Sequence, residues 1–201
     1  MMDIPIYVQG MVWDVTAIHT AYPDFLNNDV KKAIFHQDHN PFLSPIFKKV
    51  GSTKERKQIL EEKGPCVILA TSGMLTGGAS VEFFKGMAEN PKNTIIFVSY
   101  LGEGSLGRRV QSGEKQFTLD DETGKPRRLE VKMEVTTIDG LSGHASRTEL
   151  TKFIYNLDPR PRKVIIVHGE NSRCLDLAST IHKMGRIETN APKNLEAVRI
   201  R

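Results

Sequence analysis

The sequence has few cysteines, no long apolar run and no sign of a leader. Its two cysteines, Cys66 and Cys174, lie in apolar contexts and form no CxxC pair. This excludes a disulfide scaffold and is typical of a reducing compartment. No apolar run approaches the roughly 20 residues that span a bilayer. The first residues lack the charged and apolar regions of a secretory signal. We therefore expect a cytoplasmic protein without membrane contact.

Charge of one sign is not in large excess either. The chain has 28 Lys and Arg against 24 Asp and Glu, a net charge of +4. This is a mild preference for polyanions and no nucleic-acid signature by itself, because ordinary surface lysines explain it equally well. At 201 residues and 39% hydrophobic residues, the chain is expected to fold as one large domain or two small ones.

Short apolar segments alternate with helix-like segments along most of the chain. Strands are predicted at residues 4–9, 66–70, 94–100, 130–138, 163–167, 186–189 and 195–200. Helices are predicted at residues 14–22, 23–35, 53–63, 79–88, 105–111, 146–157 and 172–184. Residues 112–128 are polar, with an exposed turn at 120–126. Apolar strands alternating with helices predict an α/β fold whose parallel sheet is covered on both faces.

Two histidines lie where a predicted strand is followed by a predicted helix. His144 precedes a capping box formed by Ser146 and Glu149, and His168 follows the strand at 163–167. Loops at such junctions expose side chains, and a helix start offers N–H groups to an anion. We expect one site at one edge of a sheet, where His144 donates a proton or hydrogen bond to an anion. A surface histidine at a helix start is the plainer alternative, and a metal role for His168 requires partners.

Two glycine-rich loops also suit phosphate. Residues 71–80 (TSGMLTGGAS) offer hydroxyls and amides but lack the lysine of a nucleotide P-loop. Residues 102–107 (GEGSLG) match GxGxxG before Arg108 and Arg109, but the acidic partner of a dinucleotide site is missing. A tight turn that packs a helix on a strand is the favoured interpretation of this second loop. The cluster of His36 and His39 is expected to be non-catalytic.

Taken together, the segments resemble the C-terminal half of the beta-CASP ribonucleases of the metallo-beta-lactamase fold, especially the archaeal homologues of the cleavage and polyadenylation specificity factor endonuclease subunit. The resemblance runs through nearly the whole chain. It rests on residues 13–22 (WDVTAIHTAY), 40–43 (NPFL), 70–75 (ATSGML), 103–109 (EGSLGRR), 141–145 (LSGHA), 167–170 (VHGE) and 191–199 (APKNLEAVR).

The resemblance implies RNA cleavage with a two-zinc centre, in RNA 3′-end processing or decay. His144 matches the family's second motif, a catalytic histidine at the scissile phosphate, and His168 matches the third, a zinc ligand. A hydroxide bridging the zinc ions attacks the phosphodiester in such a centre. The phosphate-binding residues along the RNA path are then Ser72, Gly73, Ser80, Arg108, Arg109, Ser142, Gly143 and Ser146.

The chain departs from the family in one large respect. The main zinc motif, HxHxDH, is absent, as are the first beta-CASP acidic motif and the later zinc ligands. We expect residues 1–138 to form an N-terminally incomplete, Rossmann-like beta-CASP domain. Residues 139–201 are then the C-terminal segment of the metallo-beta-lactamase αββα domain. Alone the chain is expected to be inactive as a nuclease, because about three protein ligands normally hold a catalytic zinc.

The partners expected are RNA, a second copy in a homodimer, and a chain that supplies the missing metallo-beta-lactamase half. The helix at 146–157 is expected to show uncovered apolar surface, with the tail near 195–201 as a dimer contact. Two alternatives stay open: a non-catalytic RNA-binding or assembly module of a processing complex, and a fragment of a dinucleotide-binding oxidoreductase.

Overall fold

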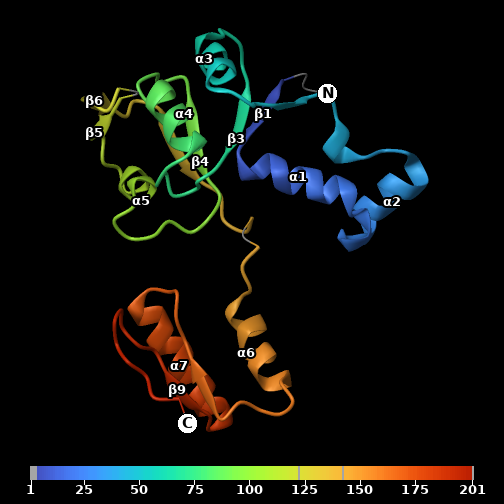
Figure 1. Ribbon diagram of the computed structural model, residues 1–201, viewed down its shortest axis with the longest axis vertical. Coiled ribbons are helices and arrows are strands. Elements are labelled where there is room, and N and C mark those ends of the chain that lie inside the picture. The colour runs from blue at the N-terminus through green and yellow to red at the C-terminus, as the bar shows by residue number, and fades with distance from the viewer. Residues whose placement is uncertain (1–3, 122, 142, 201) are drawn as a thin grey trace. The chain divides into compact units, whose positions relative to one another are not determined.

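The structure, a computed structural model, describes residues 4–121, 123–141 and 143–200. The chain divides into two compact units, residues 1–142 and 143–201 (Figure 1). Each unit is described by itself below. None of the described helices is both long and apolar enough to cross a membrane.

The first unit alternates strands and helices along the sequence. Its strands are β1 (Ile6–Gln9), β2 (Phe47–Lys49), β3 (Val67–Ala70), β4 (Thr94–Phe97), β5 (Gln116–Asp120), β6 (Pro126–Glu130) and β7 (Glu134–Thr137). Its helices are α1 (Met11–Ala21), α2 (Asn28–Gln37), α3 (Thr53–Glu61), α4 (Ala79–Met87) and α5 (Leu106–Gln111), with 3₁₀ turns η1 (Pro23–Phe25) and η2 (Pro41–Leu43).

Parallel pairing dominates this unit. The strands β2, β1 and β3 lie side by side in that order, with Ile6 opposite both Phe47 and Val67. A second parallel pair joins β4 to β7. Parallel neighbours need crossover connections, which α1, α2 and α3 supply in the first sheet and α5 supplies between β4 and β7. The predicted α/β class is confirmed.

Two apolar clusters hold the first unit together, and α4 links them. Phe84 lies in one cluster with buried residues of β4, α5 and the β5–β6 hairpin, whereas its neighbour Phe83 lies in the other with Tyr7, Val50 and Ile59. Full burial of a phenylalanine stabilises the fold by about 1.5–3 kcal/mol. The two adjacent rings therefore fix α4, and the loop before it, against both parts of the unit.

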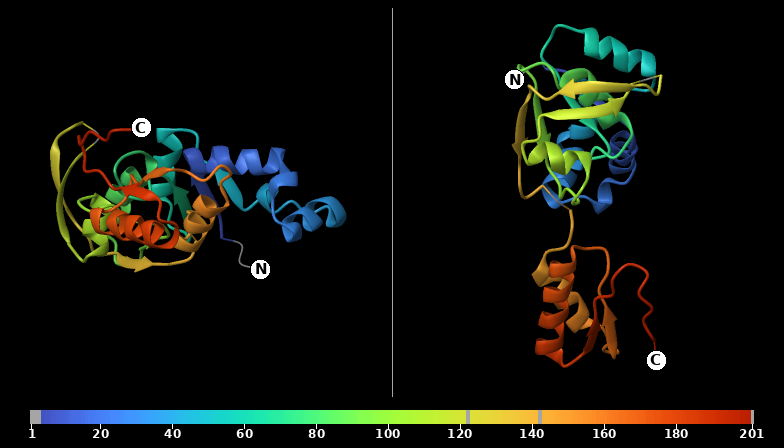
Figure 2. Two further views of the ribbon diagram at one scale, coloured as in Figure 1. Left: turned by 90° about the horizontal axis from the view of Figure 1, so that it is seen from below. Right: turned by 90° about the vertical axis from the view of Figure 1, so that its left-hand side faces the viewer.

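Two expectations for this unit were wrong. One face of β3 and β4 is uncovered, since Val67, Leu69, Ile96 and Val98 are all 39–50% exposed. The polar stretch within 112–128 holds an antiparallel hairpin of β5 and β6, best seen in Figure 2. Phe117 and Leu129 face each other across it and are both buried. A single buried residue in an otherwise charged segment is a weak signal for a strand. The turn at Asp121, in contrast, was predicted and is present.

The second unit pairs two short parallel strands with two helices. Its elements are α6 (Arg147–Asn156), β8 (Lys163–Ile165), α7 (Asn171–Gly185) and β9 (Glu188–Asn190), with Lys163 opposite Glu188. Arg147 at the start of α6 forms an ion pair with Asp176 of α7. Near the other end of α6, the hydroxyl of Tyr155 lies 3.0 Å from where a Cβ of Gly185 would stand. The helices therefore run side by side in the same direction.

The packing of this unit leaves apolar surface exposed. One stripe of α7 is buried at Cys174, Ala178 and Ile181, a spacing that gives a helix one apolar face. On α6, Phe153 is 62% and Leu150 40% exposed, so the expected uncovered surface is confirmed. The strand predicted at 195–200 is absent from the described residues there.

Candidate functional site

The loop between β3 and α4 is folded by its own hydroxyl groups. The Ser80 hydroxyl donates to the carbonyl of Ser72 at 2.7 Å. The Ser72 hydroxyl accepts from the Thr76 amide at 3.1 Å and lies 3.0 Å from the Thr76 hydroxyl. Both predicted phosphate-binding serines therefore shape the loop. Gly73, which is exposed at the tip of this loop, keeps its backbone open to an anion.

The GxGxxG loop between β4 and α5 docks onto this first loop. The Gly107 amide donates to the Met74 carbonyl at 2.9 Å, and a Cβ on Gly107 would meet that oxygen at 2.9 Å. A Cβ on Gly73 would likewise meet the Ser99 hydroxyl at 2.9 Å. These close approaches explain the glycines by packing. They favour the tight-turn interpretation over a dinucleotide site.

The two arginines of α5 have different roles. The guanidinium of Arg109 binds Glu114, with Nε 2.8 Å from Oε2, and lies 4.9 Å from the centre of the Phe117 ring. The hydrogen bond with Arg109 lowers the pKa of Glu114. Arg108 is exposed and donates a hydrogen bond to the neutral Gln111 at 2.6 Å, and it forms no ion pair with a carboxylate of the described residues. Arg108 is therefore the better placed of the two to bind a phosphate.

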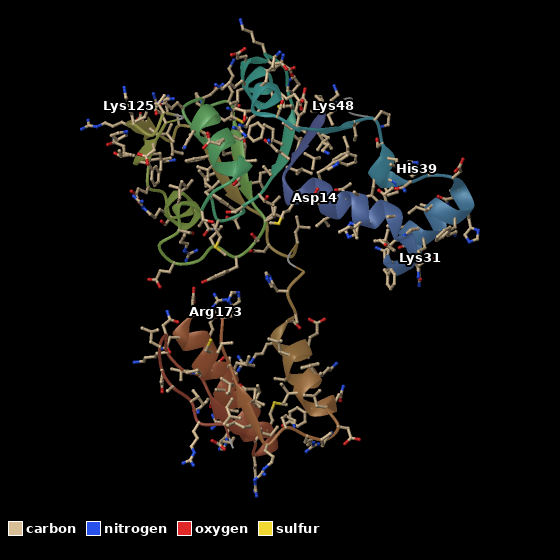
Figure 3. All side chains as sticks on the ribbon, viewed as in Figure 1. Asp14, Lys31, His39, Lys48, Lys125 and Arg173 are labelled. Carbon is tan, nitrogen blue, oxygen red and sulfur yellow. The ribbon has the colours of Figure 1, made fainter. Side chains whose placement is uncertain are left out.

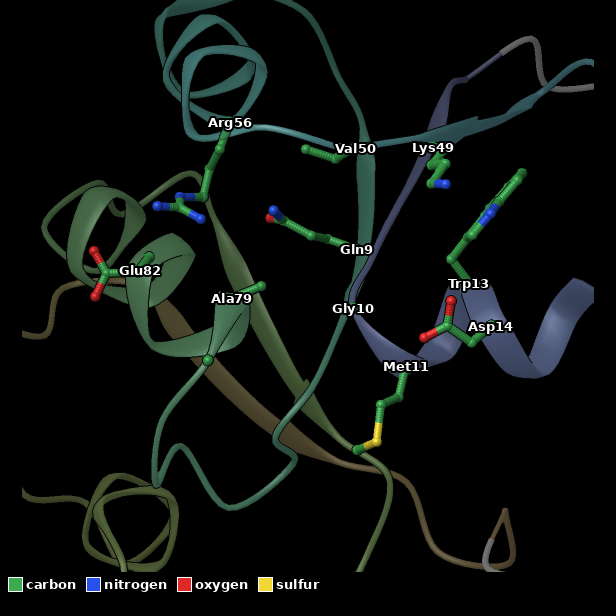
Figure 4. Close-up of a pocket in the computed structure, with 12 residues that line it drawn as sticks. Gln9, Gly10, Met11, Trp13, Asp14, Lys49, Val50, Arg56, Ala79 and Glu82 are labelled. Atoms are coloured by element: carbon green, nitrogen blue, oxygen red, sulfur yellow. The ribbon is translucent and has the colours of Figure 1, made fainter.

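An open cleft of about 750 Å³ lies beside these loops, at the carboxyl ends of β1 and β2 (Figure 4). It is lined by Gln9, Gly10, Met11, Trp13, Asp14, Lys49, Val50, Gly51, Arg56, Gly78, Ala79 and Glu82. Arg56 and Gln9 lie on one side of β1, and Trp13 and Lys49 on the other. The oxygen of the Gln9 amide is buried without a hydrogen-bond partner. Sequence reasoning missed this cleft, although Gly10 directly after the apolar strand β1 was a usable signal.

His144 lies in the loop before α6 and is exposed. The start of α6 is already capped: the Glu149 amide donates to the Ser146 hydroxyl at 3.3 Å, and the Ser146 amide donates to the Glu149 carboxylate at 2.6 Å. A carboxylate at this position disfavours a second anion there. Two of the amides at this helix start, those of Ser146 and Glu149, are thus taken. Gly143 is exposed and open to solvent, whereas Ser142 lies outside the described residues.

His168 lies between β8 and α7 and is also exposed. Its backbone is left-handed, with φ of 67°, a conformation that costs an L-residue of order 1 kcal/mol. No side chain caps α7, whose first residue follows Glu170. A strained, exposed histidine beside an uncapped helix start is a good candidate for a functional group.

The two histidines follow strands of different units, and that these strands share one sheet stays a prediction. The strand before His144, β7, pairs with β4, whereas β8 before His168 pairs with β9. What they share is a place at the start of α6 and of α7. These two helices run in the same direction, so both histidine loops lie at one end of the second unit.

Among the described residues, no group of three His, Cys, Asp or Glu side chains is arranged to bind an ion. His168 therefore offers a single donor where about three are normally needed.

The capping of α6 predicts a specific pH dependence. Hydrogen bonds from Ser146 lower the pKa of Glu149 below its ordinary value of 4.5. The stability that this carboxylate contributes is fully present above that value and is lost as pH falls through the lowered pKa of the folded state. We expect Glu149→Gln, which keeps a capping acceptor, to remove this share of the acid sensitivity of helix content, measured by circular dichroism. An unchanged acid transition in the variant would rule out the capping role.

Comparison with protein families matches most of the chain. Residues 1–110 match the Beta-Casp domain, and residues 128–192 match the Zn-dependent metallo-hydrolase RNA specificity domain. These assignments are compatible with the resemblance inferred from the motifs. The predicted domain boundary at residue 138 stays a prediction.

Individual relatives agree with the domain matches. The transcription termination factor FttA of Thermococcus kodakarensis is 52% identical over 200 residues, which are all of this chain and 31% of that protein. The factor FttA of Methanocaldococcus jannaschii is 50% identical over 201 residues, 32% of its length, and that of a Lokiarchaeum is 48% identical over 195 residues, 97% of this chain and 30% of its own. The chain thus spans about a third of the length of these relatives. Since the Beta-Casp domain alone covers more than half of its residues, the chain belongs to the beta-CASP family of metallo-hydrolases.

Proposed function

We propose that this chain holds RNA for cleavage, as part of a zinc-dependent ribonuclease that acts at RNA 3′ ends. The observation that carries the proposal is the docking of the 71–80 loop on the 102–107 loop. It places flexible backbone amides beside the exposed Arg108 guanidinium. Backbone amides and arginine bind phosphates whatever the base sequence. Because the relatives are transcription termination factors, the RNA 3′ end is the site of action that we propose.

The proposed roles of the two histidines are those that the family resemblance implies, and both side chains are exposed. His144 would contact the phosphate and supply a proton or hydrogen bond to the leaving oxygen. His168 would be one zinc donor, and the remaining donors would come from residues outside this chain, because the described residues do not complete a centre. A zinc pair would supply charge stabilisation at the phosphate in the assembled enzyme.

The test is a complementation assay. The 201-residue chain alone, with zinc, is expected to leave a single-stranded RNA intact. Addition of a protein that supplies the N-terminal metallo-beta-lactamase half is expected to produce cleavage. Gel electrophoresis of labelled RNA detects the cleavage products. Zinc-dependent cleavage by the purified chain without that protein would contradict the proposal.

A second candidate is an RNA-binding or assembly module without catalysis. The lack of a three-ligand metal group among the described residues favours it. The same assay separates the two, since a non-catalytic module binds RNA but yields no cleavage after complementation. The homodimer remains a prediction. The exposed side chains of Phe153 and of Leu195 near the tail are the surfaces that it would cover.

A further inference from the structure

The charge of this chain is distributed very unevenly between its two units. Residues 143–201 contain 11 Lys and Arg against 6 Asp and Glu, whereas residues 1–142 contain 17 against 18. The second unit thus carries +5 and the first unit −1. The whole excess of positive charge lies in the smaller unit, which makes that unit the part attracted to a polyanion.

Four exposed cations gather at one end of this unit, which we call the basic patch: Arg160, Arg162, Lys183 and Arg186. The first two lie between α6 and β8, and the others lie at the end of α7. Three contacts bring the arginines together, and Lys183 lies near them in the last turn of α7. The Arg160 guanidinium lies 5.5 Å from the centre of the Tyr155 ring, and the hydroxyl of that ring approaches Gly185, next to Arg186. The pairing of Lys163 with Glu188 sets Arg162 beside the start of β9.

The four cations of the basic patch differ from three other cations of the unit, which are bound by carboxylates. Arg147, Lys163 and Arg173 are held by Asp176, Glu188 and Glu170. Within the described residues, no carboxylate forms an ion pair with any of the four patch cations. Unpaired guanidinium and ammonium groups keep their donors for a ligand, and guanidinium groups bind phosphate oxygens in pairs.

The patch is remote from the histidines. His144 and His168 precede α6 and α7, at the end marked by Arg173 in Figure 3, whereas the patch lies where both helices end. The 10 residues of α6 separate the two ends by about 15 Å, at 1.5 Å per residue. One phosphate cannot reach both ends, but a strand of several nucleotides can.

We propose that the basic patch is a second RNA-binding surface, which binds the phosphodiester backbone of single-stranded RNA away from the reacting phosphate. The proposal rests on the proposed function, because it takes RNA as the ligand. Contacts of this kind go to phosphates and carry no base specificity. The patch would therefore raise affinity for long RNA of any sequence and lengthen the segment that is held.

The experiment compares three forms of the 201-residue chain. One is unchanged. The second combines Arg160→Gln, Arg162→Gln and Lys183→Gln. The matched control removes the same charge from exposed positions of the first unit, with Lys32→Gln, Lys54→Gln and Lys63→Gln. Affinity for a single-stranded RNA of about 20 nucleotides is measured by fluorescence anisotropy between about 50 and 200 mM salt, the range over which phosphate contacts are revealed.

We expect the patch variant to bind at least about tenfold more weakly than the control at low salt. We also expect its slope of log K against log salt to be smaller by about 2, since each lost phosphate contact on a single strand removes about 0.7. Thermal melting checks that the variants fold. If the triple variant does not, the pair Arg162→Gln and Lys183→Gln, which keeps the contact of Arg160 with the Tyr155 ring, is expected to show a slope smaller by about 1.4.

The outcomes separate this proposal from the proposed function. If the unchanged chain binds RNA and the patch variant binds as tightly as the control, only the patch proposal is overturned. An acidic protein surface is then the alternative ligand of the patch. No RNA binding by the unchanged chain overturns both.

Discussion

Replacing His144 by alanine is expected to lower the rate of RNA cleavage in the complemented assembly by at least about 100-fold, because positioned proton donors contribute about 10²–10⁴ to rates. The side chain is exposed, so the substitution leaves no cavity and the melting temperature should stay nearly unchanged. His168→Ala is expected to be as damaging to the rate and also to lower the zinc content of the assembly, measured by atomic emission. Exposed His39, in the first unit, provides the control, since His39→Ala should cleave at the normal rate.

The distinction between the two histidines lies in the metal measurement. His144→Ala should retain zinc, whereas His168→Ala should lose part of it. Cleavage within about twofold of the normal rate after His144→Ala would show that this residue is only a surface histidine at a helix start, and the proposed chemistry would be wrong.

Replacing Gly107 by alanine is expected to destabilise the first unit by about 1–3 kcal/mol, the usual cost of forcing an extra carbon into a packed interior. The new Cβ would stand 2.9 Å from the Met74 carbonyl oxygen and 3.0 Å from its carbon. These are backbone atoms that cannot move without breaking the hydrogen bond between the two loops. Alanine is the better helix former by about 1 kcal/mol, so the measured loss is what remains after that gain.

The same substitution is expected to weaken RNA binding, because the loops that present Gly73 and Arg108 depend on this contact. Gly64→Ala is the matched control, since nothing lies within 4 Å of a Cβ at that position. Urea unfolding measures the stability of both variants, and anisotropy measures their RNA binding. Equal stability of the two variants would mean that the loops are not docked through Gly107.

The sequence predicted the parts of this fold in which local pattern and tertiary packing agree. The capping residue Ser146 was predicted from its spacing to Glu149, and it caps its helix in the structure. Strand β3 and helix α4 follow the apolar pattern closely. The GxGxxG loop was interpreted as a packing device, and the position of Gly107 supports that interpretation.

The missed features depend on contacts distant in sequence. The hairpin of β5 and β6 has one buried residue on each strand, Phe117 and Leu129, amid charged neighbours. Such a segment looks polar until the two strands pair. The pairing of β7 with β4 was not predicted either, because no local pattern shows which strands lie side by side. The basic patch likewise requires α6 and α7 to end side by side.

The central claim is that the 71–80 and 102–109 loops and the loop holding His144 bind RNA phosphates. A nuclear magnetic resonance titration of the ¹⁵N-labelled chain with single-stranded RNA tests it most directly, residue by residue. Amide signals of residues 71–80, 102–109 and 143–146 are expected to shift at low salt and to return toward their free positions as salt displaces the RNA. RNA binding that leaves all three groups of signals unmoved would contradict the account.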